Sequence, residues 1–170
     1  TTGQANEGRS YTFHGSAGGL NAVAATIDEG NLAGAHFGTA VGTAGDVNGD
    51  GYADVVVGAP YYTDGESNEG RVWVWHGSAS GLSSLNDWNT QSNQIDANFG
   101  IAVATAGDVN GDGYSDLIVG ASGYHNPSTN EGAAFVYHGS PATLSDAADW
   151  SKRSNQANAY FGWSVGTAGD

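Results

Sequence analysis

The stretch DVNGDGYAD at residues 46–54 decides the fold of this chain, because it returns as DVNGDGYSD at residues 108–116, 62 positions later. Its opening aspartate occurs once more as Asp170, the last residue. Each full copy carries short oxygen-bearing side chains at its first, third, fifth and ninth positions, with glycine at the fourth and sixth. This pattern is typical of a loop that wraps a hard divalent cation. A cation site at constant spacing indicates that the loop belongs to a repeated structural unit.

The same repeat runs through the whole chain, since every residue aligns with the residue 62 positions later without a gap. Residues 37–98 and 99–160 form two complete units. Residues 1–36 match the final part of a unit, and residues 161–170 match the start of another. We therefore expect the chain to begin and end inside units, as a window on a longer array.

Each unit has a β pattern and no helical periodicity. Small residues fill 38–45, a valine-rich run buried on both faces is expected at 54–59, apolar and polar side chains alternate over 71–76, and a polar outer strand is expected at 88–95. Four short strands in each repeated unit are typical of propeller blades. The predicted fold is all-β, with four-stranded antiparallel blades of a β-propeller-like tandem repeat.

Composition excludes several classes of partner. Eighteen acidic residues against four basic ones give a net charge of −14, which disfavours binding to nucleic acid and anionic membranes. The chain has no cysteine, so disulfides and thiol chemistry do not contribute. No apolar run approaches the roughly 18 residues of a membrane span.

Calcium is the cation that best suits these loops, because all the donors are oxygens on a flexible backbone. Magnesium prefers a stricter octahedron, and zinc prefers cysteine or histidine ligands. An EF-hand would place glutamate at position 12, where this chain has Val57 and Val119 inside apolar runs. The predicted calcium ligands are Asp46, Asn48, Asp50, the carbonyl of Tyr52 and Asp54, then Asp108, Asn110, Asp112, the carbonyl of Tyr114 and Asp116, with Asp170 opening a third loop.

Three motifs in constant order give the chain its resemblance to a known family. Phe37-Gly38, the aspartate loop and Gly58-Ala59-Pro60 resemble the FG-GAP repeat of integrin α-subunit propellers and of secreted bacterial proteins. The second unit repeats them with Ser122 in place of the proline, and Phe161-Gly162 opens the third. The resemblance implies four-stranded blades, a calcium loop between the first and second strands, and a closed ring of seven blades. The uniform period and the absence of cysteine fit a bacterial-type array.

Recurrent aromatic and histidine residues have a structural and a functional interpretation. His14, His76 and His138 are expected to close a strand and bond into a turn, in preference to forming a metal or catalytic ring. Aromatic side chains on the third strand are expected to pack between blades in preference to binding carbohydrate. Trp88 and Trp150 are expected to be partly exposed. Phe37, Phe99 and Phe161 are expected to anchor one blade against the next.

Residues 63–70 and 124–132 connect the second and third strands and vary most between units. Each ends in an Asn-Glu-Gly turn, and the variable portion before that turn is where a partner could be recognised. The resemblance places such loops on the face opposite the calcium loops.

The sequence therefore predicts an extracellular, non-enzymatic calcium-binding module with a structural or adhesive role. Its partner would be a protein or glycan ligand on the cell surface or matrix. One alternative is the building block of an extracellular filament, formed by self-association through incomplete units. Another is an accessory domain of a secreted lipase or polysaccharide-degrading enzyme, although the chain has no nucleophile elbow, HExxH motif or phosphate-binding loop.

Overall fold

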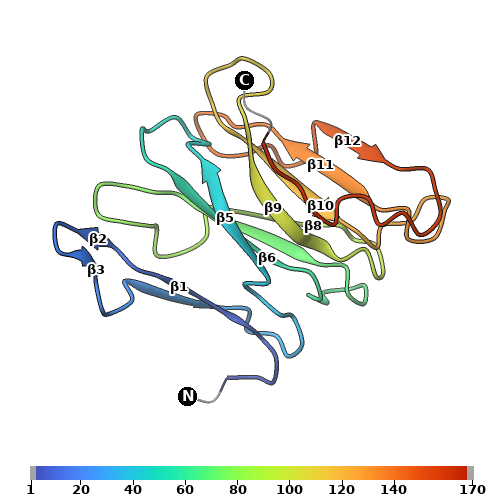
Figure 1. Cartoon of the computed structure of the whole chain (residues 1–170), viewed down its shortest axis with the longest axis horizontal. Coiled ribbons are helices and arrows are strands. Elements are labelled where there is room, and N and C mark those ends of the chain that lie inside the picture. The colour runs from blue at the N-terminus through green and yellow to red at the C-terminus, as the bar shows by residue number, and fades with distance from the viewer. Residues whose placement is uncertain (1–2, 168–170) are drawn as a thin grey trace.

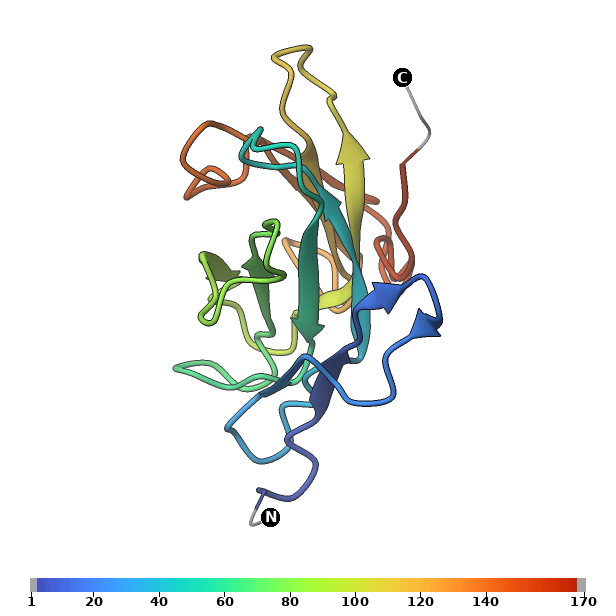
Figure 2. The same cartoon turned by 90° about the vertical axis from the view of Figure 1, so that its left-hand side faces the viewer.

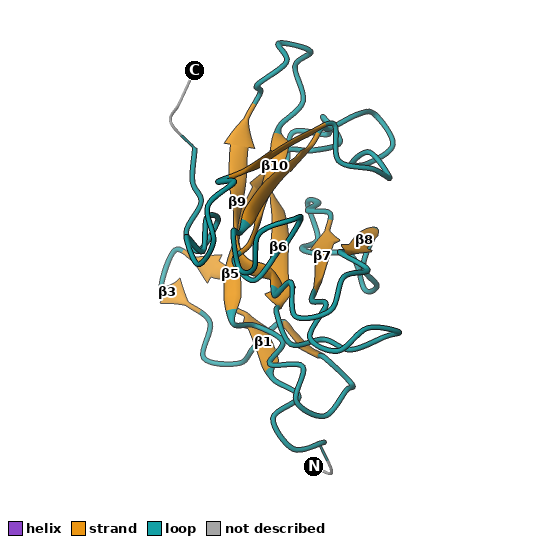
Figure 3. Ribbon diagram, turned by 90° about the vertical axis from the view of Figure 1, so that its right-hand side faces the viewer, coloured by secondary structure: helices purple, strands orange, loops and turns teal. Residues whose placement is uncertain are grey.

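The computed structural model describes residues 3–167, which contain strands, turns and loops but no helix (Figure 3). The predicted all-β class is therefore confirmed. The twelve strands are β1 (Arg9–Thr12), β2 (Gly15–Ser16), β3 (Gly19–Leu20), β4 (Thr26–Glu29), β5 (Ala40–Gly45), β6 (Asp54–Ala59), β7 (Arg71–Trp75), β8 (Trp88–Gln91), β9 (Phe99–Gly107), β10 (Asp116–Ala121), β11 (Ala133–Tyr137) and β12 (Trp150–Arg153).

Two four-stranded antiparallel sheets correspond to the two complete repeats. Strands β5-β6-β7-β8 form one blade and β9-β10-β11-β12 form the other, each in simple chain order. The β1–β4 pair has the same relation as β7–β8 and lies beside the first blade, while β2 and β3 form a small hairpin (Figures 1 and 2). We call the contact between the β1–β4 pair and the first blade the first junction. The contact between the two blades is the second junction.

The strand β6 is buried on both faces, as its valine-rich sequence predicts. Val56 contributes to the core of the second junction, together with Val72, Val74, Phe99 and other apolar side chains from both blades. Val57 and Ala59 contribute instead to the core of the first junction. One strand therefore supplies two cores, because its blade lies between two neighbours.

The phenylalanine that opens each unit connects consecutive blades. The backbone N–H of Phe99 donates to the carbonyl of Glu69 in the first blade at 3.2 Å. Its ring packs edge-on against Phe135 of the second blade, with centroids 5.6 Å apart. Phe37 has the same arrangement at the first junction, bonding to Glu7 and packing against Trp73. The predicted anchoring role is confirmed for Phe37 and Phe99, while Phe161 is 42% exposed.

Two sequence expectations about the outer strand were wrong. The strand expected at 88–95 ends at Gln91, because Asn93 adopts a left-handed φ of 52° that ends the extended backbone. Trp88 was expected to be partly exposed but is only 5% exposed, because Tyr137 of the next blade covers it. Trp150 occupies the equivalent position in the second blade and is 50% exposed, as predicted.

Candidate metal centre

The first aspartate-rich loop joins β5 to β6, where the sequence places it. The two carboxylate oxygens of Asp46 accept the N–H groups of Asp50 and Gly51 at 3.0 and 2.8 Å. The side-chain oxygen of Asn48 also accepts the N–H of Asp50, at 3.1 Å. A carboxylate oxygen of Asp50 accepts the N–H of Tyr52, at 2.9 Å. Three oxygen-bearing side chains thus point at one short run of backbone, on the inner side of the loop.

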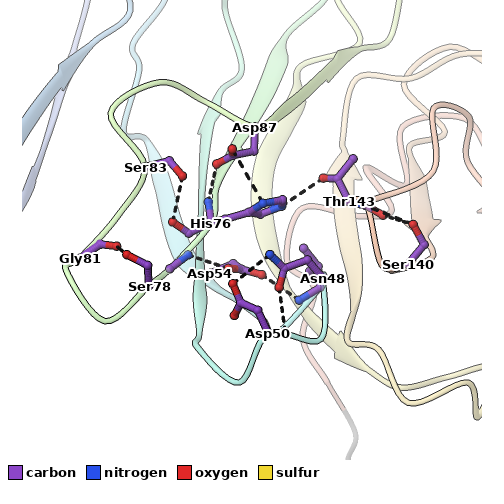
Figure 4. Close-up of polar contacts among 12 residues, drawn as sticks. Asn48, Asp50, Asp54, His76, Ser78, Gly81, Ser83, Asp87, Ser140 and Thr143 are labelled. Atoms are coloured by element: carbon purple, nitrogen blue, oxygen red, sulfur yellow. Dashed lines mark hydrogen bonds and ion pairs between the residues drawn. The ribbon is translucent and has the colours of Figure 1, made fainter.

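The ninth residue, Asp54, is the most buried of the predicted ligands. It is fully inaccessible, and its carboxylate accepts the N–H groups of Val47 and Gly77, each at 2.8 Å (Figure 4). Burial raises the pKa of the Asp54 carboxyl, and the two hydrogen bonds oppose that change. Asp54 therefore connects Val47, at the start of the loop, to Gly77, which comes directly after His76, the residue that follows β7.

The second loop, between β9 and β10, has the same geometry. Asp108 accepts N–H groups from Gly111, Asp112 and Gly113 at 2.7–3.0 Å. The bond from Gly113 contributes most to holding the pKa of Asp108 below its ordinary range. Buried Asp116 accepts the N–H groups of Val109 and Gly139 at 2.8 and 2.9 Å. Gly51 and Gly113 have φ of 88° and 92°, so both sixth positions require the left-handed backbone that glycine adopts readily.

These loops fit calcium by their donor chemistry. All side-chain donors are carboxylate or amide oxygens, and those that accept a single N–H retain a further lone pair, whereas Oδ1 of Asp108 accepts two N–H groups. Within residues 3–167, however, no three carboxylate or imidazole side chains converge closely enough to hold a metal ion. The structure thus arranges the predicted ligands around each loop without drawing them to a common point. Asp170 lies outside the described residues.

The first loop is also bonded directly to the second blade. The carbonyl of Asp46 accepts the N–H of Ser115 at 2.9 Å, and the carbonyl of Val47 accepts the N–H of Ser140 at 3.0 Å. The ring of Tyr114 also lies against Gly49. Sequence reasoning missed this connection, because it depends on how successive blades are placed side by side.

The histidines close strands and contact the next blade. The backbone N–H of His76 donates to Asp87, and its Nε2 lies 3.2 Å from the hydroxyl of Thr143 in the second blade (Figure 4). The backbone of His138 pairs in the same way with Asp149. His14 lies against Gly81, the residue equivalent to Thr143. The predicted role in a turn is therefore confirmed.

A buried glutamate shapes the loop at the opposite end of β6, a role that the sequence analysis did not assign. The carboxylate of Glu69 is inaccessible and accepts the N–H of Asp64, five residues earlier, at 2.7 Å. Glu131 accepts the N–H of Asn126 in the same way at 2.8 Å. The recurrence of glutamate in every Asn-Glu-Gly turn was the available signal.

The arginine beside the buried glutamate lies on different strands in the β1–β4 pair and in the second blade, while in the first blade Arg71 pairs with Asp64 at 3.7 Å. Position 9 is arginine and lies 3.6 Å from Glu7, whereas the equivalent position 133 in the second blade is alanine. There Arg153 lies 3.7 Å from Glu131. Residues 133 and 153 are direct partners across β11 and β12, so the positive charge has moved to the facing strand. The charge near the buried carboxylate is kept while its source changes.

Comparison with known proteins agrees with this repeat geometry. A model of the FG-GAP repeat matches residues 37–75 and again residues 99–137. Both segments are FG-GAP repeats. Each match runs from the anchoring phenylalanine through the aspartate loop to the third strand of the blade. The predicted resemblance is confirmed.

The FG-GAP chain is similar to integrin α-subunits. It is 41% identical over 121 residues to Integrin alpha-PS2 of Drosophila melanogaster, covering 66% of this chain. It is 37% identical over 117 residues to Integrin alpha-3 of Cricetulus griseus, and 35% identical over 126 residues to Integrin alpha-6 of Homo sapiens. The last two matches cover 68% and 71% of this chain. The matches span only 8–11% of these three relatives. The bacterial-type array stays a prediction.

No helix in residues 3–167 is both long and apolar enough to cross a membrane.

Proposed function

We propose that this chain is an extracellular, non-enzymatic module that binds calcium in its two complete aspartate-rich loops and serves as a structural or adhesive scaffold. The ligands would be the oxygens of Asp46, Asn48, Asp50 and Asp54 with the carbonyl of Tyr52, and the equivalent oxygens of the second loop. The bound protein or glycan would lie on the cell surface or matrix. The variable parts of 63–70 and 124–132 are the proposed recognition loops.

The bonds between the first loop and the second blade carry this proposal. Calcium that holds Asp46 would also fix the two carbonyls that Ser115 and Ser140 contact. Ordering one loop would therefore stiffen the second junction, which is what a scaffold of stacked blades requires. Removing the cation would leave three carboxylates in each loop without a counter-charge.

The linkage between binding and folding sets the expected gain in stability from calcium. An ion that binds only the folded loop adds about 2.7 kcal/mol of stability per site at a hundredfold excess of the free ion over Kd. Extracellular calcium modules commonly have Kd values of about 10⁻⁴–10⁻³ M, so these loops would fill outside the cell. The related integrin α-subunits and the FG-GAP repeats support the adhesive part of the proposal.

The proposal is tested by calorimetric titration of the metal-free chain with calcium, together with thermal unfolding in calcium, magnesium and EDTA. We expect two sites and a melting temperature that falls sharply in EDTA and is poorly restored by magnesium. Asp46→Ala and Asp108→Ala should each remove one site. Asp146→Ala, which removes the same charge from an exposed position outside both loops, should leave both sites intact. Identical melting curves in calcium and EDTA would contradict the proposal.

A further inference from the structure

The first junction contains a cavity, whereas the second junction contains the buried side chain of Trp88. The cavity measures about 530 Å³ and lies between β4 and the first blade. Its walls include the aromatic side chains of Tyr62, Trp73 and Trp75, with Asp28, Ser84 and Asn86 as polar neighbours. This volume is in the range of small-ligand sites.

The chain itself shows which group fits such a space. At the second junction, the indole of Trp88 packs edge-on against Tyr137, with centroids 5.1 Å apart, and its Nε1 donates to the carbonyl of Ser145 at 3.2 Å. The residue equivalent to Trp88 at the first junction is Thr26, whose side chain is much smaller. The equivalents of Tyr137 and Ser145 are Trp75, which lines the cavity, and Ser83, the neighbour of the lining residue Ser84.

Two residues that line the cavity are larger and more apolar than their equivalents at the second junction, which favours the docking of a partner. Ile27 and Leu85 line the cavity and are 54% and 78% exposed. Their equivalents at the second junction are Asn89 and Ala147. Exposed apolar side chains around a concave site are characteristic of protein-binding surfaces. Asp28, equivalent to Thr90, adds a carboxylate that can accept an indole N–H.

We propose that the first junction binds a tryptophan side chain presented by a partner protein, in the way that Trp88 fills the second junction from within the chain. The ring would enter between Ile27 and Leu85, pack edge-on against Trp75, and donate its N–H to Asp28 or to a backbone carbonyl beside Ser84. This inference rests on the proposed adhesive function and specifies the chemistry of its ligand.

The direct test is a ¹⁵N–¹H NMR titration of the calcium-loaded full chain with N-acetyl-L-tryptophanamide. We expect saturable shifts confined to residues 27–31, 73–75 and 84–86 and their immediate neighbours. Parallel titrations use N-acetyl-L-argininamide and methyl glucoside. Shifts caused by either of these in place of the indole, no shifts with the indole, or indole shifts elsewhere would overturn the assignment.

Thr26→Trp supplies a matched competitor, because it gives the first junction the residue that the second already has. We expect this variant to weaken probe binding at least about tenfold. Val23→Trp adds the same side chain at an 80% exposed position that precedes β4, and it should leave binding unchanged. Unchanged binding by a folded Thr26→Trp variant would overturn the inference. If Thr26→Trp does not fold, the shift map of the natural chain decides.

Calcium titration of the same samples separates the two proposals. A normal calcium response without indole binding would overturn the tryptophan site and leave the scaffold proposal standing. Loss of the calcium response would contradict the scaffold proposal itself, whatever the probe does.

Discussion

The two junctions are built from the same repeat positions but are completed in different ways. At the second, Trp88 is covered by Tyr137, and backbone groups of the first loop bond to the second blade. At the first, Thr26 stands in the tryptophan position and a cavity remains beside Trp75. The comparison shows that the strands and the anchoring phenylalanine are the same at both junctions. The side chains in the outer part of each junction differ in size and charge.

Removing Trp88 should have the largest effect on this comparison. Trp88→Ala deletes a buried ring and its hydrogen bond, so we expect a loss of about 3–5 kcal/mol in the free energy of unfolding. Trp150→Ala, at the equivalent half-exposed position, should cost less than about 1 kcal/mol. Urea denaturation of both variants measures the difference. Equal losses would mean that covering by the next blade is not what stabilises Trp88.

A glycine pair tests how closely the second junction is packed. Gly45 and Gly107 are equivalent and have φ of 85° and 82°, so alanine is strained at both. A Cβ at Gly45 would lie 2.4 Å from the Cβ of Ser115, whereas the nearest atom at Gly107 is 3.5 Å away. We expect Gly45→Ala to cost about 2–4 kcal/mol and Gly107→Ala about 1 kcal/mol. Chemical denaturation that finds equal costs would contradict this packing.

A smaller effect is expected when the positive charge of Arg153 is moved to the facing position on the neighbouring strand. Arg153→Gln leaves buried Glu131 without its nearby cation and should cost about 1 kcal/mol, because the arginine is itself partly exposed. Adding Ala133→Arg, which restores the arrangement of Arg9 and Glu7, should recover about half of that loss. Lys152→Gln removes the same charge from an exposed neighbour and should have little effect. No recovery in the double variant would show that the two strand positions are not interchangeable.

Replacing Asp28 should have the smallest effect, and that effect should depend on pH. Burial raises the pKa of the Asp28 carboxyl, while the neighbouring Thr26 side chain opposes the rise. The folded chain therefore holds this proton more tightly than the unfolded chain, and stability is lost as pH rises through the folded-state pKa. Asp28→Thr, which introduces the residue found at the second junction, should be more stable than the natural chain at about pH 7, by less than about 1 kcal/mol. The difference should disappear below the ordinary carboxyl pKa of about 4. Paired urea curves at the two pH values measure it, and an advantage that grows in acid would contradict the assigned direction.

Local sequence patterns predicted the strands because their causes are local. The valine run at 54–59 forms a strand over its whole length, and the alternation expected over 71–76 forms a strand as far as Trp75. The error at 92–95 has a local cause too, in the left-handed Asn93, which the polar composition of that stretch did not reveal.

The remaining errors and omissions concern contacts between blades. The burial of Trp88 depends on Tyr137, which is 49 residues away in the next unit. The bonds from Ser115 and Ser140 to the first loop, and the cavity beside Trp75, likewise depend on the placement of neighbouring sheets. The predicted calcium ligands lie around their loops, and calcium binding stays a prediction.

The bonds from Ser115 and Ser140 to Asp46 and Val47 give the stack a direction. Donor groups on the second blade meet acceptor groups on the first, and the two sets come from different positions in the repeat. Such a head-to-tail contact is heterologous, so neighbouring blades cannot exchange roles about a twofold axis. Any blade added by duplication would have to follow the same polarity, and the rotation between one blade and the next would decide whether the series closes or continues.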